Sequence, residues 1–194
     1  MAFPLIVSFY TPDPVYSGCA EVLRQSLDNF DLEYEIDCFQ PPLNPTYQKI
    51  CQYKAIFIKA KMIRHPDRNI VWLDADSELV EYPGLLNNIN TDIASVLWAD
   101  KQLLISILYC ANNAKVNNLI DKWISINNDN YGDRNADQAN LEKLLNESPD
   151  ISFLKLSESY AYVPNETKGV ESPVIIQYLA SRTKQGYDVY GQEK

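Results

Sequence analysis

Two aspartates separated by one small residue are the part of this sequence best suited to chemistry. Asp74 and Asp76 directly follow the apolar run Ile-Val-Trp-Leu at positions 70–73. A short apolar run is typical of a buried strand, and open α/β sheets bind ligands at the carboxyl ends of their strands. Carboxylate oxygens suit Mg²⁺ or Mn²⁺, which in proteins often also bind phosphate. The pattern predicts metal-assisted chemistry on a phosphorylated substrate; the alternative is a solvated pair of carboxylates, as expected for nearby Glu78.

The elements that must position this pair alternate between strand and helix. Apolar periodicity and turn residues predict strands at 5–10, 32–39, 70–73, 92–98, 103–110, 151–156 and 174–178, and helices at 16–30, 47–64, 116–124 and 137–145. Residues 82–86 read as a turn or short helix. This order favours one α/β domain over residues 1–194 with a mixed central sheet, and a polar tail over about 183–194.

Composition narrows the class of protein further. The net charge is −9, from 17 basic and 26 acidic residues, which disfavours nucleic acid as a partner. The four cysteines form no CxxC pair and there is a single histidine, so a zinc site has little support and free thiols in a reducing compartment are expected. The N-terminus does not resemble a signal peptide, and no apolar run approaches the ~20 residues of a membrane span. We therefore expect a soluble, cytoplasmic protein.

Four further segments accompany the aspartate pair. They are Lys-Ala-Ile-Phe-Ile at 54–58, Tyr-Pro-Gly-Leu-Leu at 82–86, Asp-Gln-Ala-Asn-Leu at 137–141, and residues 174–182, which end in Ala-Ser-Arg. Together they resemble the motifs of nucleotide-diphosphosugar transferases with the GT-A fold and the DxD signature. The pattern is most similar to the small glycosyltransferase domain with which a large algal virus decorates its capsid protein. The resemblance covers residues 5–182.

The resemblance implies a GT-A-like, Rossmann-like α/β fold and a glycosyltransferase of the hexosyltransferase type. It implies transfer of a sugar from a nucleotide diphosphosugar, a UDP-sugar, to a glycan or glycoprotein acceptor with Mn²⁺ or Mg²⁺ as cofactor. A viral relative would act in the host cytoplasm, and fusion to further domains is compatible with the family.

The same resemblance assigns roles at the metal site. Asp76 is the direct metal ligand, and Asp74 contacts the ribose or the ion. Relatives often carry a histidine near the C-terminal motif that completes the metal shell, and this chain has Gln177 there. An amide oxygen is a weaker ligand. Residues 105–109 carry larger side chains than the family's small glycine-containing segment, which reshapes the sugar or acceptor pocket.

The nucleotide site is expected at the end of the first strand and around the metal. The residues implied are Ser8, Tyr10, Thr11, Tyr16, Asp37 as acceptor of the uracil N3–H, Lys54 on nucleotide or phosphate, and Arg182 on the diphosphate. Each has an ordinary alternative: an unremarkable strand end for the first group, a solvated helix lysine for Lys54, and a surface salt bridge for Arg182.

Asp137 is implied to lie near the acceptor hydroxyl or the transferred sugar, where a carboxylate can orient or deprotonate the acceptor. Asp133 is the reserve candidate. The alternative for Asp137 is ordinary charge stabilisation of a first helical turn.

Other charged and aromatic residues are expected to be structural. Lys59, Lys61 and Arg64 read as a solvated helix face, His65 as helix-end packing, and Trp72 as core.

Two rival functions remain open at this point. A haloacid-dehalogenase-like phosphatase also places Asp-x-Asp after an apolar strand, but its motif usually lies near the N-terminus and continues with Gly-Thr rather than Ser-Glu-Leu. A nucleotide-binding module without catalysis is the second rival, suggested by Gln177 and the altered segment 105–109.

Overall fold

The computed structural model describes residues 3–41, 46–99, 101–130 and 136–181. Its centre is a six-stranded mixed sheet with the order β2-β1-β3-β6-β5-β7. The strands are β1 (Leu5–Tyr10), β2 (Tyr34–Cys38), β3 (Ile70–Leu73), β5 (Ile93–Trp98), β6 (Gln102–Cys110) and β7 (Phe153–Leu156). Strand β1 is parallel to both β2 and β3, β6 is antiparallel to β3 and β5, and β7 is parallel to β5. The expected mixed α/β sheet is confirmed.

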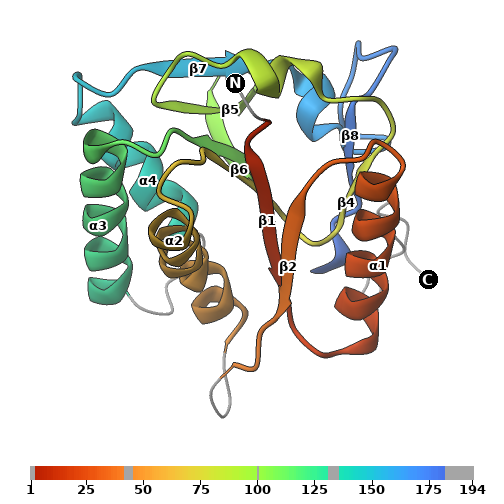
Figure 1. Ribbon diagram of the computed structural model, residues 1–194, viewed down its shortest axis with the longest axis horizontal. Helices are drawn as coiled ribbons and strands as arrows, with labels where there is room; N and C mark the ends of the chain where they lie inside the picture. The colour runs from red at the N-terminus through yellow and green to blue at the C-terminus, as the bar shows by residue number, and fades with distance from the viewer. Residues whose placement is uncertain (1–2, 42–45, 100, 131–135, 182–194) are drawn as a thin grey trace.

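Helices and a small second sheet cover the two faces (Figure 1). Helices α2 (Tyr47–Arg64), α3 (Ala114–Asp129) and α4 (Ala136–Asn146) pack together on one face. Helix α1 (Pro14–Asp28) covers the other, with the antiparallel pair β4 (Ser77–Leu79) and β8 (Ile175–Gln177). Two 3-10 helices, η1 (Gly84–Asn88) and η2 (Glu158–Ala161), complete the described elements. No described helix is long and apolar enough to cross a membrane.

The alternation of β1 shows why the core has two halves. Successive strand residues point to opposite faces. Leu5, Val7 and Phe9 join the buried cluster formed with α2, α3 and α4, whereas Ile6 joins the cluster beneath α1 and the small sheet. The strand is therefore buried on both sides, as expected for a central parallel strand.

Side-chain caps set the start of the helices that flank the site. Asp13 accepts the amide of Tyr16 at 3.1 Å and is followed by Pro14 at the first helical position of α1. Thr46 accepts the amide of Lys49 at 3.3 Å at the start of α2. Both helices follow the carboxyl ends of strands, so their first turns border the same edge of the sheet.

Strand β4 is one element that the sequence did not predict. It has three residues, and its partner β8 lies about a hundred positions away, at Ser77 opposite Gln177. So short a run has no detectable period of its own. The strand expected at 174–178 exists as β8, but it belongs to this small sheet rather than to the central one.

Candidate functional site

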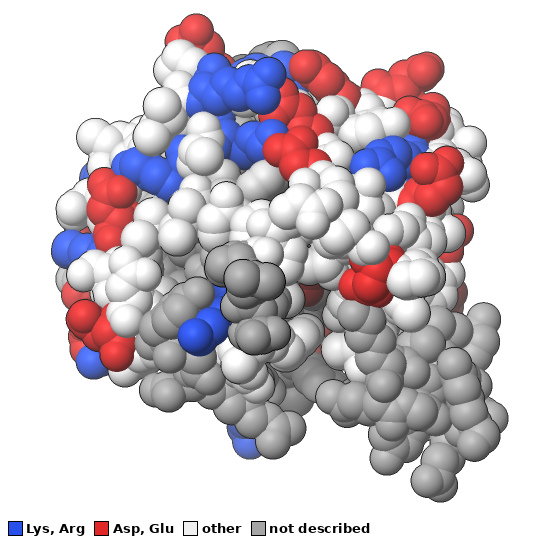
Figure 2. Space-filling model, turned by 90° about the horizontal axis from the view of Figure 1, so that it is seen from below, with Lys and Arg blue, Asp and Glu red and all other residues white. Residues whose placement is uncertain are grey.

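A cavity of about 370 Å³ opens at the carboxyl ends of β1 and β3. Figure 2 looks onto this end of the molecule. The lining residues come from β1, α1, α2, β3 and the C-terminal segment: Phe9, Tyr10, Thr11, Tyr16, Tyr47, Ile50, Cys51, Lys54, Trp72, Asp74, Ala75, Asp76 and Ser181. The parallel pairing of β1 with β3 brings these distant parts of the chain together. Both aspartates of the DxD motif therefore face a cavity at the edge where α/β sheets bind ligands.

One carboxylate oxygen of Asp74 carries two strong contacts. Lys54 Nζ lies 2.8 Å from Asp74 Oδ1, and the indole Nε1 of Trp72 donates to the same oxygen at 2.8 Å. The Lys54 ammonium also donates to the carbonyl of Ile105 at 3.0 Å and lies 5.1 Å from the centre of the Trp72 ring. A carboxylate has about four acceptor positions. Asp74 is thus fixed through one oxygen and retains acceptor capacity on the other.

Lys54 is a buried cation and not a solvated helix residue, since it is 6% exposed. Burial alone lowers the pKa of an ammonium group. Here the carboxylates of Asp74 and Asp137 outweigh that effect and raise the pKa of Lys54 above its usual value. Lys54 therefore keeps its charge and lies within the electrostatic reach of both acids.

Asp76 is held by the C-terminal segment. The amide of Ala180 donates to Asp76 Oδ2 at 2.7 Å, and the amide of Tyr178 donates to the backbone carbonyl of Asp76 at 2.9 Å. Burial and the neighbouring charge of Asp74 raise the pKa of Asp76 to about 6. Two carboxylates that repel each other at one site are stabilised by a cation placed between them.

Asp137 lies in the first turn of α4 and is 7% exposed. Burial raises the pKa of its carboxyl group, and Lys54 opposes this shift. The indole of Trp123 donates to the backbone carbonyl of Asp137 at 2.7 Å and fixes the start of the helix. Asp137 is not among the described residues that line the cavity, and the charge of Lys54 acts on both Asp137 and Asp74.

The expected nucleotide residues divide into two groups. Tyr10, Thr11, Tyr16 and Lys54 line the cavity. Burial and the Asp76 carboxylate raise the pKa of Tyr16, so its hydroxyl stays protonated. Ser8 is fully buried on β1, and its hydroxyl has no hydrogen-bond partner among the described residues.

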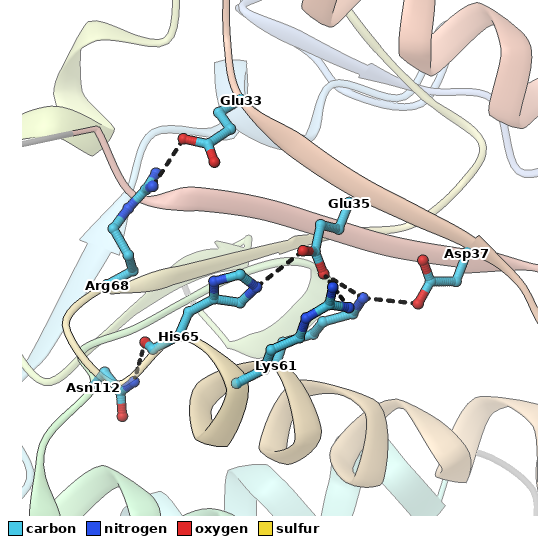
Figure 3. Close-up of polar contacts among 8 residues, drawn as sticks. Glu33, Glu35, Asp37, Lys61, His65, Arg68 and Asn112 are labelled. Carbon is cyan, nitrogen blue, oxygen red and sulfur yellow. Dashed lines mark hydrogen bonds and ion pairs between the residues drawn. The ribbon is translucent and has the colours of Figure 1, made fainter.

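Asp37 lies in a separate network beside α2 (Figure 3). Its carboxylate is 2.7 Å from Lys61 Nζ, which also contacts Glu35 at 2.6 Å. Glu35 is 3.0 Å from His65 Nε2. Lys61 is 5% exposed, so the expected solvated lysine is wrong: two acids on β2 make its burial tolerable. His65 ends α2 as predicted.

Gln177 is not among the described residues that line the cavity. Gln177 is 2% exposed, its Oε1 accepts from Ser77 Oγ at 2.9 Å, and its Nε2 has no partner in the part of the chain that the structure describes. Asp133 and Arg182 lie outside the described residues.

Sequence reasoning missed the second role of Trp72. The residue is core, as predicted, at 2% exposed. It is also the indole donor to Asp74. Positions two apart on a strand share a face, so the Trp-x-Asp spacing carried a signal for this contact. Tyr47 and Cys51 of the cavity wall had no such signal, because their place depends on how α2 packs.

The donor set fits a hard divalent cation bound together with phosphate. No group of three or more His, Cys, Asp or Glu side chains able to hold a metal occurs among the described residues. At the cavity the described residues include two carboxylates, those of Asp74 and Asp76. Mg²⁺ typically takes one or two carboxylates and completes its shell with water and substrate phosphates.

No protein-family model matches the sequence, and no curated protein matches it. Solved structures do share its fold. A glycosyltransferase involved in the glycosylation of the major capsid of PBCV-1 aligns with a TM-score of 0.72 over 95% of this chain and 97% of its own, at 12% identity. This is the kind of enzyme that the sequence motifs indicated.

A second similar protein is the glycosyltransferase GlyE of Streptococcus pneumoniae TIGR4. Its apo form aligns with a TM-score of 0.61 over 92% of this chain at 14% identity, and another crystal structure of it with 0.58 at 12%. The present chain spans 55% of GlyE. Since both proteins share the whole central architecture with this chain, the protein has the fold of a GT-A-like glycosyltransferase.

Proposed function

We propose that this protein is a metal-dependent glycosyltransferase that moves a sugar from a nucleotide diphosphosugar, a UDP-sugar, to a glycan or glycoprotein acceptor. One observation carries the proposal: Asp74 and Asp76 line a cavity at the carboxyl ends of β1 and β3, with the buried Lys54 fixed on Asp74. The shared fold with two glycosyltransferases supports the reaction class.

Asp76 is the proposed principal ligand of Mn²⁺ or Mg²⁺, and Asp74 the second. When bound, the ion neutralises the negative charge that develops on the departing diphosphate. The protein's own contribution is orientation. Lys54 and Trp72 fix one oxygen of Asp74, and the Ala180 amide fixes one oxygen of Asp76. Gln177 Oε1 accepts one hydrogen bond from Ser77, so one of its two lone pairs would remain for the ion.

The nucleotide would lie along Tyr10, Thr11 and Tyr16, whose side chains come from the first strand end and α1. Tyrosine offers a flat apolar face for a base and a hydroxyl for hydrogen bonding. Arg182 directly follows the cavity residue Ser181 in sequence and is the proposed cation for the diphosphate. Ser8 and Asp37 remain weaker proposals for this site.

Asp137 is the proposed group that orients or deprotonates the acceptor hydroxyl. Its raised pKa brings a carboxylate closer to the range useful for a general base. Asp133 is the reserve. By analogy with the PBCV-1 enzyme, which is involved in glycosylation of that virus's major capsid, a capsid glycoprotein is the proposed acceptor. A cytoplasmic location is proposed from the sequence alone.

The decisive experiment combines binding and turnover. Calorimetry of the purified protein with UDP, with and without Mn²⁺, should show metal-dependent binding. A panel of UDP- and GDP-sugars should then show hydrolysis or transfer for at least one donor. Hydrolysis of a generic phosphate ester without turnover of any nucleotide sugar would support the phosphatase alternative. UDP binding without turnover would support the non-catalytic module.

A further inference from the structure

We propose that a second groove, between α2 and α3, binds sugar rings of the acceptor glycan. The proposal rests on the function proposed above and names where the acceptor lies. The groove has a volume of about 400 Å³ and is lined on one side by Lys49, Gln52, Tyr53 and Ile56 of α2. Ile124 and Asn128 of α3 line the other. Nothing in the roles assigned so far uses these side chains.

Aromatic and aliphatic groups form most of the groove wall. The rings of Phe39 and Tyr53 stack with centroids 4.1 Å apart and an angle of 14° between their planes. Ile56, at 39% exposed, presents an aliphatic surface beside them. The face of an aromatic ring is negative, so it attracts the polarised C–H groups of a sugar ring. The stacked pair is a rigid platform of that kind.

Polar side chains form the rest of the groove wall. Gln52 and Asn127 are buried, at 4% and 2% exposed, and their amides are bonded within the protein: Gln52 Nε2 donates to the Asn130 carbonyl at 2.8 Å, and Asn127 Oδ1 accepts from Asn140 Nδ2 at 2.9 Å. Lys49 and Asn128 add an ammonium and a further amide. Amides both donate and accept, which matches sugar hydroxyls. An aromatic face together with groups that donate and accept hydrogen bonds matches the two kinds of surface on a sugar ring, its C–H groups and its hydroxyls.

The groove and the DxD cavity share structural walls. Ile50 lines both. Phe9 lines the cavity, and the centroid of its ring lies 5.4 Å from that of Phe39 and 5.5 Å from that of Tyr53. It also lies 5.2 Å from Trp72, the donor to Asp74.

The amide contact on the other side reaches α4, the helix that begins with the proposed acceptor residue. Asn140, which fixes Asn127 of the groove, lies on α4 one turn beyond Asp137. The groove therefore has a contact with the helix that carries Asp137, and it shares Ile50 with the DxD cavity. This continuity with the proposed donor site favours the acceptor as its ligand.

Methyl NMR provides a direct test. The protein is labelled at isoleucine δ1 methyls and titrated with lactose, maltose, cellobiose and chitobiose to about 50 mM, because single sugar sites bind in the millimolar range. We expect saturable shifts at Ile50, Ile56 and Ile124. Ile63, 66% exposed on the same helix but outside the groove, should not respond. UDP with Mn²⁺ should shift Ile50 without shifting Ile56 or Ile124.

A matched pair of variants then connects binding to activity. Ile56→Glu places a charge in the groove, and Ile63→Glu places the same charge on the same helix away from it. We expect Ile56→Glu to raise the acceptor KM at least about tenfold, equivalent to about 1.4 kcal/mol. UDP binding and hydrolysis of the donor by water should be unchanged. Ile63→Glu should match the parent protein throughout.

Three results would overturn the proposal: no saturable sugar shift in the groove, equal behaviour of the two variants, or groove shifts that depend on protein concentration rather than sugar. The last would assign the groove to self-association. If sugars shift the groove methyl signals but the protein neither binds UDP nor turns over any donor, the groove is a sugar-binding site and the proposed transferase function is wrong.

Discussion

The side chains of Lys54, Trp72 and Asp74 form the best-defined contact at the residue scale. Two donors meet one carboxylate oxygen at 2.8 Å each. Charge-assisted hydrogen bonds of this kind are the strong ones, and they fix a side chain before any ligand arrives. Asp76 is held by a backbone amide instead. The cavity is therefore built around two acids that are oriented by different parts of the chain.

The first prediction concerns the proposed principal metal ligand. Asp76→Ala should abolish metal-dependent UDP binding, because it removes half of the carboxylate charge that faces the cavity. Calorimetry with UDP and Mn²⁺ measures this. Asp121→Asn is the control, because Asp121 is an exposed carboxylate on α3 that pairs with Lys59 of α2. Unchanged UDP affinity in Asp76→Ala would contradict the site assignment.

The second prediction compares the two buried lysines of α2. Lys54→Met leaves the Asp74 carboxylate without its buried partner, so it should lower the free energy of unfolding by on the order of 3 kcal/mol. Lys61→Met should cost less, about 1 kcal/mol, because Asp37 is 53% exposed and Glu35 keeps its contact with His65. Urea unfolding measures this loss. Only Lys54→Met should also weaken metal-dependent UDP binding, since Lys61 contacts Glu35 and Asp37 away from the cavity. Equal UDP affinity in the two variants would exclude a role for Lys54 in positioning Asp74.

At the scale of elements, the two halves of α2 have different contacts. Its first half lines both the cavity and the groove, and its last turns form ion pairs with the acids of β2. Strand β2 is an edge strand, and Glu35 and Asp37 point from one of its faces toward α2 (Figure 3). These ion pairs tie the edge of the sheet to the helix and so set the position of α2 against β1.

The pH dependence of stability tests this tie. Burial raises the pKa of Glu35, but hydrogen bonds and charge from Lys61 and His65 outweigh it and lower the pKa below its usual 4.5. The unfolded state then binds more protons than the folded state as pH falls through 4.5. The stabilisation is present above that pH and lost below the folded pKa.

We therefore expect Glu35→Gln to destabilise the protein at pH 7, and the difference from the parent to shrink as the pH falls below 4.5 and to vanish below the folded-state pKa of Glu35. Urea unfolding of both proteins across this range measures it. A difference in the free energy of unfolding that stays constant with pH would mean that the charge of Glu35 does not contribute to stability.

At the scale of the whole molecule, the last described segment returns to the DxD motif. Strand β8 pairs with β4 directly after the motif, and the following residues donate to both the backbone and the side chain of Asp76. Contacts across about a hundred positions thus close one side of the cavity. The same overall architecture in the PBCV-1 enzyme and GlyE shows that very different sequences form it.

Hydrogen exchange can test this closure. In Asp76→Ala the Ala180 amide loses its acceptor, so its exchange should accelerate about tenfold, as expected for one hydrogen bond of about 1.4 kcal/mol. The Tyr178 amide bonds the Asp76 carbonyl, which the variant keeps, and should exchange as before. Equal acceleration at both amides would indicate that the whole segment has detached.

The sequence alone determined the order of elements, because apolar periodicity is local: β1, β3 and α2 begin and end within about two residues of the expected positions. It also placed the two acids at the end of a buried strand, since a short apolar run followed by polar residues is a local pattern. The pairing of Trp72 with Asp74 was open to the same local reasoning.

Tertiary structure decided what those residues do to one another. Lys54 became a buried partner of Asp74, Asp37 was drawn to Lys61, and Gln177 turned to Ser77. Strand β4 and the groove between α2 and α3 exist through contacts between segments far apart in the chain. Burial, and with it pKa and ion pairing, depends on which surfaces meet in three dimensions, and no local pattern carries that information.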